Sequence, residues 1–171
     1  MSRNLVSLIL LLFSISLPAS ACRMLPIEKN VERYIYDLVK GTPDIYLAEA
    51  ESFSKDDESV TLKVKEVIRG EKKDSITIPG NITSPGTNDY NLHRKNIFWE
   101  NILEGRTTYG VDCRFNPTFE IGGKYLILFK EPFQSKSLEL IKSKNDFWYY
   151  RVKEILGMKK FRKFIPKRDA P

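Results

Sequence analysis

The sequence predicts a mainly β fold of the α+β class, in which five strands lie between an N-terminal and a C-terminal helix. Apolar and polar residues alternate strictly over residues 60–67, which is typical of a strand with one buried face. A run of Tyr, Leu, Ile and Phe within residues 124–130 indicates a buried strand. Apolar residues recur at helical spacing before the first strand and after the last, and this pattern predicts the two flanking helices.

The first half of the chain holds one helix and three strands. We expect the helix over residues 27–40, where apolar residues recur at helical spacing before Gly41 and Pro43 stop the helix. The strands are predicted over residues 44–53, 60–67 and 75–79. The buried face of the second strand is predicted to carry Val60, Leu62 and Val64.

Residues 81–112 are predicted to leave the sheet as a long excursion. Gly, Pro, Asn and Asp are frequent in its first part, and a short helix is expected around Phe98 and Trp99. Trp99 and Trp148 are interpreted as core or lid aromatics.

Two strands and a helix complete the domain, which we place at residues 22–157. The strands are expected over residues 124–130 and 138–141. Asn145 or Asp146 is predicted to cap the last helix, and Gly157 to end it. Five strands with long inserts fit a small Greek-key barrel such as the OB-fold.

Residues 1–21 are predicted to be a secretory signal peptide, so that the mature chain begins at Cys22. Arg3 supplies a positive start, residues 5–17 form an apolar stretch, and small residues precede the cleavage point. This stretch is shorter than the about 20 apolar residues that a spanning helix needs. We therefore expect the protein in the periplasm or outside the cell.

The net charge of +6 is concentrated at the end of the chain. Residues 158–171 form a basic tail, whereas residues 22–157 hold as many acidic as basic side chains. A nucleic-acid-binding domain would carry basic residues across its binding face, so no nucleic-acid partner is expected. The tail is suited to touching an anionic surface.

The chain has two cysteines, Cys22 and Cys113, and one histidine, His93. An even number of cysteines in an exported chain favours a disulfide. Two Cys and one His do not give the spacing of a zinc site, so neither an intrinsic metal nor a cofactor is predicted. His93 is interpreted as a lone exposed residue, although Asp89 and Glu100 lie near it in sequence. Since there is also no Gly-x-Ser-x-Gly motif, we expect a binding protein and not an enzyme.

Four motifs occur in an order that is found in a known family. Residues 22–26 read Cys-Arg-Met-Leu-Pro, residues 44–48 and 60–70 cover the first two strands, and Cys113 precedes Gly-Lys-Tyr-Leu at residues 123–126. This order resembles the tissue inhibitors of metalloproteinases and their bacterial-type, single-domain relatives with a netrin-module-like OB-fold. The motifs span most of residues 22–141.

The resemblance implies an OB-fold and a role as a protease inhibitor. In that family a disulfide holds the N-terminal cysteine, whose α-amine and carbonyl chelate the zinc of a target protease. The resemblance therefore implies that Cys22 is the chelating tip of this chain and that Arg23 contacts the specificity pocket of the protease. It also implies a disulfide between Cys22 and Cys113. Met24 stands where the family has its second cysteine, and animal inhibitors usually have a small residue in place of Arg23. The expected partner is an extracellular zinc protease.

A second hypothesis makes the chain an outer-membrane lipoprotein with a structural or interaction role. Residues 19–22, Ala-Ser-Ala-Cys, also resemble a loose lipobox. Lipidation would consume the thiol of Cys22, and acylation of its amine would remove the zinc ligand, so no inhibitory activity would follow. The two hypotheses therefore exclude each other chemically, and the sequence leaves both open.

Overall fold

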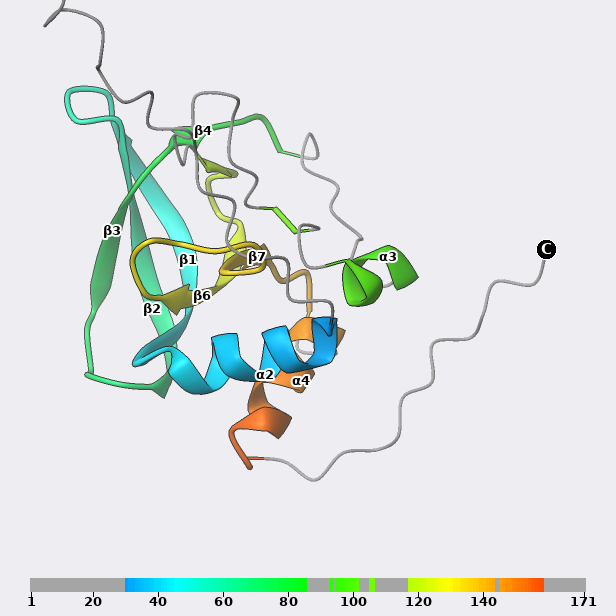
Figure 1. Ribbon diagram of the computed structural model, residues 1–171. Coiled ribbons are helices and arrows are strands. Elements are labelled where there is room, and N and C mark those ends of the chain that lie inside the picture. Colours follow the sequence, from blue (N-terminus) through cyan, green and yellow to red (C-terminus); the bar gives the residue numbers. More distant parts are fainter. Residues whose placement is uncertain are drawn as a thin grey trace, which may run out of the picture.

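Figure 1 shows the computed structural model, which describes residues 30–85, 93, 95–101, 105–106, 117–143 and 145–158. The predicted α+β class is confirmed, because these residues form a five-stranded antiparallel sheet, a two-stranded parallel ladder and three helices. No helix among them is long and apolar enough to cross a membrane.

The main sheet has the strand order of a Greek key. Its strands are β1 (Asp44–Ser54), β2 (Ser59–Arg69), β3 (Ser75–Pro79), β6 (Lys124–Phe129) and β7 (Leu138–Leu140). The first three follow one another along the chain, and β6 returns after a long connection to pair with β1. The order β3-β2-β1-β6-β7 therefore contains the Greek-key arrangement of four strands. All five predicted strands are present, with ends shifted by no more than one or two residues.

The predicted barrel, by contrast, is not closed. β3 and β7 are the two edges of the sheet, and no pairing joins them in the described part of the chain. β7 is only three residues long, and the backbone carbonyl of Leu138 accepts a hydrogen bond from Nε of Arg106 at 2.9 Å. A side chain thus occupies an edge group that a closing strand would need.

Both faces of the central strands are buried, because consecutive side chains of a strand point to opposite faces. In β6, Leu126 and Leu128 join the core beneath the helices, whereas Tyr125 and Ile127 join a second core on the opposite face. The second core is completed by side chains such as Val60, Leu62, Ile78, Phe119 and Leu140. The sheet therefore separates two cores.

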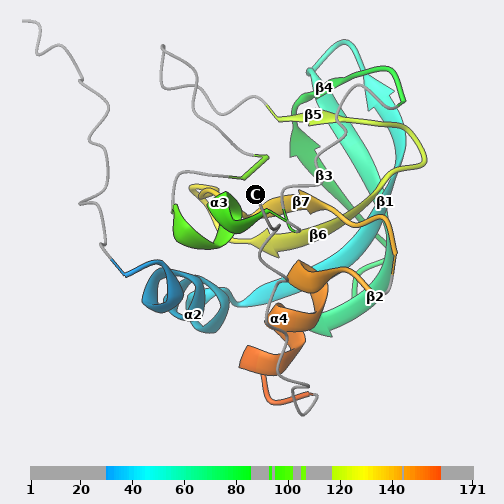
Figure 2. The same ribbon diagram turned by 90° about the vertical axis from the view of Figure 1, so that its right-hand side faces the viewer.

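Three helices cover one face of this sheet. They are α2 (Val31–Gly41), α3 (Asn96–Glu100) and α4 (Phe147–Ile155). Asn30 caps α2, since its side-chain oxygen accepts a hydrogen bond from the Arg33 N–H at 3.0 Å. Figure 1 and Figure 2 both show α2 and α4 side by side below the sheet, with β4 at the opposite end. All three helices agree with the prediction in type and place, and residues 27–29 of the first expected helix lie outside the described residues.

A bulge in β2 decides which side chains face the helices. Val64 pairs with Ala48 of β1 and Glu66 pairs with Leu47, which leaves Lys65 as an extra residue. Without the bulge, the regular alternation that points Val64 toward the second core would point Glu66 there as well. Because of the bulge, the Glu66 carboxylate instead reaches α4.

The prediction misses a short parallel ladder. β4 (Asn81–Ile82) pairs with β5 (Thr118–Phe119), and Phe119 is fully buried in the second core. Strands of two residues are too short to show a periodic pattern, so the sequence alone places residues 81–82 in the excursion.

Burial of both faces predicts that two adjacent residues of β6 are equally important for stability. Ile127→Ala and Leu128→Ala each truncate a side chain with no exposed surface, one in each core. Each should lower the free energy of unfolding by about 2–5 kcal/mol, measured by urea denaturation. Ile121→Ala, at a side chain that is 46% exposed, is the control and should be nearly neutral. A nearly neutral effect at Ile127 or Leu128 would show that one face of the strand is open to water.

Candidate functional site

The residues predicted to form the functional tip, Cys22 and Arg23, lie outside the described residues, and so does Cys113. The disulfide and the zinc-chelating role therefore stay predictions. Asp89 and residues 159–171 of the basic tail also lie outside. The described residues contain two polar sites, which are a buried cluster around His93 and a pocket between the sheet and α4.

His93 is buried, with 2% of its surface exposed, so the prediction of an exposed histidine is wrong. Its ring lies between two carboxylates. Nδ1 is 2.9 Å from Oδ1 of Asp146, which precedes α4, and Nε2 is 3.1 Å from Oε2 of Glu139 in β7. We call His93, Glu139 and Asp146 the histidine cluster. Glu100 is exposed at the end of α3 and takes no part in it.

Backbone N–H groups also hold both carboxylates of the histidine cluster. Oδ1 of Asp146 accepts a hydrogen bond from the Trp148 N–H at 2.9 Å, which makes Asp146 the N-cap of α4. Oε1 of Glu139 accepts one from the Arg106 N–H at 2.8 Å. Gly105 allows this close approach, because a Cβ atom there would lie 2.8 Å from Oε1 of Glu139.

The histidine cluster favours the protonated imidazole. Burial lowers the pKa of His93, but the hydrogen bonds and negative charges of Asp146 and Glu139 outweigh burial and raise the pKa to about 9. Each ring N–H then donates to one carboxylate. Since neither nitrogen is left to accept a proton from a substrate, the cluster is suited to a structural ion pair and not to general base catalysis.

The histidine cluster is not a metal site either. Its two carboxylates contact different ring nitrogens and so do not converge with the imidazole on one point. Within the described ranges, no group of three or more His, Cys, Asp or Glu side chains is arranged to hold a metal ion.

Aromatic side chains enclose the histidine cluster. Phe98 of α3 packs edge-on against the His93 ring, with centroids 4.8 Å apart, and against Trp148 at 5.5 Å. Nε1 of Trp99 donates a hydrogen bond to the backbone carbonyl of His93 at 3.0 Å. Trp148 is fully buried in the core and Trp99 is half-buried against it, which agrees with the predicted core or lid role. This apolar surrounding strengthens the polar contacts inside it.

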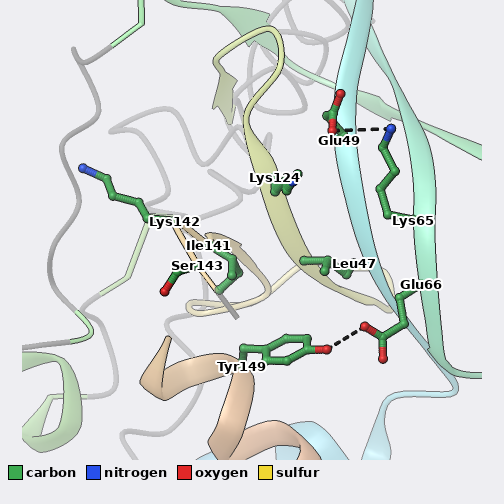
Figure 3. Close-up of a pocket in the computed structure, with 9 residues that line it drawn as sticks. All are labelled: Leu47, Glu49, Lys65, Glu66, Lys124, Ile141, Lys142, Ser143 and Tyr149. Carbon is green, nitrogen blue, oxygen red and sulfur yellow. Dashed lines mark hydrogen bonds and ion pairs between the residues drawn. The ribbon is translucent and has the colours of Figure 1, made fainter. Parts of the chain in front are cut away.

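A pocket of about 300 Å³ lies between the sheet and the start of α4 (Figure 3). Leu47 of β1, Ile141 after β7 and the ring of Tyr149 in α4 supply its apolar lining. The remaining lining residues are polar or charged, and they are Glu49, Lys65, Glu66, Lys124, Lys142 and Ser143. No sequence motif marks this pocket, because its residues come from separate segments that meet only through the bulge in β2 and the packing of α4.

The two carboxylates of the pocket have partners. Glu49 forms an ion pair with Lys65 at 3.4 Å. Glu66 accepts a hydrogen bond from the Tyr149 hydroxyl at 2.5 Å and contacts Nζ of Lys153 at 2.5 Å. Burial and the adjacent Glu66 carboxylate raise the pKa of Tyr149, so its phenol stays protonated and donates.

Comparison of the chain with models of protein families, with curated proteins and with solved structures finds no match. The resemblance to the tissue inhibitors of metalloproteinases therefore stays a prediction from motifs. Function has to be inferred from those motifs and from the geometry of the two sites.

The histidine cluster predicts that stability falls as the pH rises toward 9. The pKa of His93 is about 9 in the folded chain, above the ordinary value of 6.5. The protonated ring therefore stabilises the fold fully below about pH 6.5, and this contribution is lost as the pH rises through 9. We expect the difference in unfolding free energy between the wild type and His93→Gln to shrink by about 3 kcal/mol over this range. Denaturant titrations at several pH values measure it.

The comparison with His93→Gln cancels the titration of lysines and tyrosines elsewhere, because both proteins share them. Asp146→Asn is a conservative second variant, since it keeps an acceptor for the Trp148 N–H but removes one charge next to His93. It should reduce the pH-dependent part of the stability while α4 stays capped. A difference between wild type and His93→Gln that does not change with pH would contradict the protonated cluster.

Proposed function

We propose that this protein is an exported binding protein without catalytic activity, which contacts an extracellular zinc protease through a tip formed by Cys22 and Arg23. The observation that carries the proposal is the Greek-key order of the main sheet, because an OB-type scaffold is what the resemblance implies. Since one fold hosts many functions, the motifs at the N-terminus specify the inhibitor-like role, and the sheet supplies the scaffold for it.

The proposed tip binds zinc through two atoms of one residue. The neutral α-amine and the carbonyl oxygen of Cys22 would chelate the metal, and Arg23 would enter the specificity pocket of the protease. A disulfide to Cys113 would hold the terminus rigid and so lower the entropic cost of binding. α2 begins at Val31 and packs on the sheet, and in the sequence the eight residues 23–30 lie between Cys22 and this helix.

The histidine cluster supports a binding role over a catalytic one. His93 is the only histidine of the chain, and carboxylates hold both of its ring nitrogens. A residue fixed in this way is used by the fold and is not available to a substrate.

The intact mass of the exported protein, measured without reduction, tests the state of Cys22. We expect the mass of residues 22–171 less two hydrogens, because the thiols of Cys22 and Cys113 would join. Added acyl mass would identify the lipoprotein instead and would end the inhibitor proposal, since acylation removes the amine as a zinc ligand. Two free thiols would leave the tip without its tether and would also contradict the proposal.

Inhibition assays against a panel of secreted zinc proteases test the tip directly. We expect dose-dependent inhibition by the mature protein, and its loss when Ala21 is retained before Cys22, because the amine then becomes an amide. The retained residue leaves the disulfide and the fold intact, which circular dichroism checks. Arg23→Ala should change which proteases are inhibited. Full activity of every protease in a large excess of the mature protein would overturn the proposal.

A further inference from the structure

We propose that the pocket between the sheet and α4 binds a small organic anion, a carboxylate or phosphate ester with a compact apolar body. This proposal does not rest on the proposed role of Cys22. Its residues come from β1, β2, β6, α4 and the segment after β7.

The apolar half of the pocket is formed by well-packed side chains. Leu47, Ile141 and Tyr149 are buried, with 7%, 4% and 3% of their surfaces exposed. The hydrogen bond from the Tyr149 hydroxyl to Glu66 fixes the position of the tyrosine ring, as Figure 3 shows. The volume of about 300 Å³ is at the lower end of the range for small-molecule sites, so the ligand body is compact.

The charged half of the pocket has an excess of positive charge. Lys65, Lys124 and Lys142 line it together with Glu49 and Glu66, so the lining residues carry one more positive than negative charge. Lys153, which is not one of the lining residues, forms an ion pair with Glu66. Figure 3 shows Lys124 close to Glu49, and Lys142 extending outward on the other side. Ammonium groups on long flexible stems, such as the exposed side chain of Lys124, can turn toward a bound anion, and a local excess of one charge attracts the opposite one.

The combination of the two halves selects the ligand class. The positive excess disfavours cations, and the buried apolar lining gains nothing from a fully hydrated inorganic anion. An anion with an apolar body satisfies both halves, because the body covers Leu47 and Ile141 while the charged group meets the lysines. Ser143 at the rim can donate a further hydrogen bond to the charged group.

Benzoate and phenyl phosphate are suitable probes, with benzamide and inorganic phosphate as the uncharged and the non-apolar comparison. Titration of the mature protein, followed by NMR of the Leu47 and Ile141 methyl groups, should give saturable shifts with the first two. Benzamide and inorganic phosphate should bind at least several-fold more weakly. Equal shifts with benzamide, or no saturable shift with either organic anion, would overturn the proposal.

Matched charge variants locate the binding to this pocket. Lys124→Gln should weaken benzoate binding about two- to fivefold, which is the range for a solvent-exposed charge pair. Lys55→Gln makes the same change of net charge at an exposed residue in the β1–β2 turn and should have no effect. Both variants change exposed side chains, so both should fold. An equal loss in both would show that binding depends on net charge and not on the pocket.

Discussion

The ion pairs of His93 with Glu139 and Asp146 are the interaction on which the arrangement of the helices depends. A buried charge is costly unless it is paired and hydrogen-bonded, and here every member of the cluster is. Asp146 begins α4 and Glu139 lies in β7, so the imidazole fixes the start of the helix relative to the sheet edge. Loss of His93 would leave two carboxylates without a partner of opposite charge, and one of them, Glu139, is fully buried, so the imidazole is the member on which the cluster depends.

The position of α4 in turn determines the pocket. Tyr149 and Lys153 reach Glu66 from α4, and Glu66 points that way only because the bulge at Lys65 reverses the alternation of β2. After the bulge, Val67 packs against the second core, whereas Ile68 joins the core beneath the helices. Because of this one extra residue, β2 contributes side chains both to the apolar second core and to the polar pocket.

The regular elements could be predicted from the sequence because their signals are local. The alternation at Val60–Val64, the apolar run of β6 and the cap at Asp146 each depend on neighbouring residues only. Three other features depend on residues far apart in the chain. They are the open edge at β7, the parallel pair of β4 with β5 and the burial of His93. The one available hint was Glu139, a charged residue in the middle of a buried strand, which needs a partner of opposite charge.

The functional account rests on how the chain uses its only histidine. If His93 is a protonated part of the fold, it is not available as a base, and this is consistent with the proposed binding roles of the N-terminal tip and the pocket. NMR of the ¹⁵N-labelled His93 ring over a pH series tests this most directly. The account predicts that both ring nitrogens carry protons at about pH 7 and that the ring titrates near pH 9. A neutral ring at about pH 7, or titration at or below the ordinary pKa of 6.5, would contradict it.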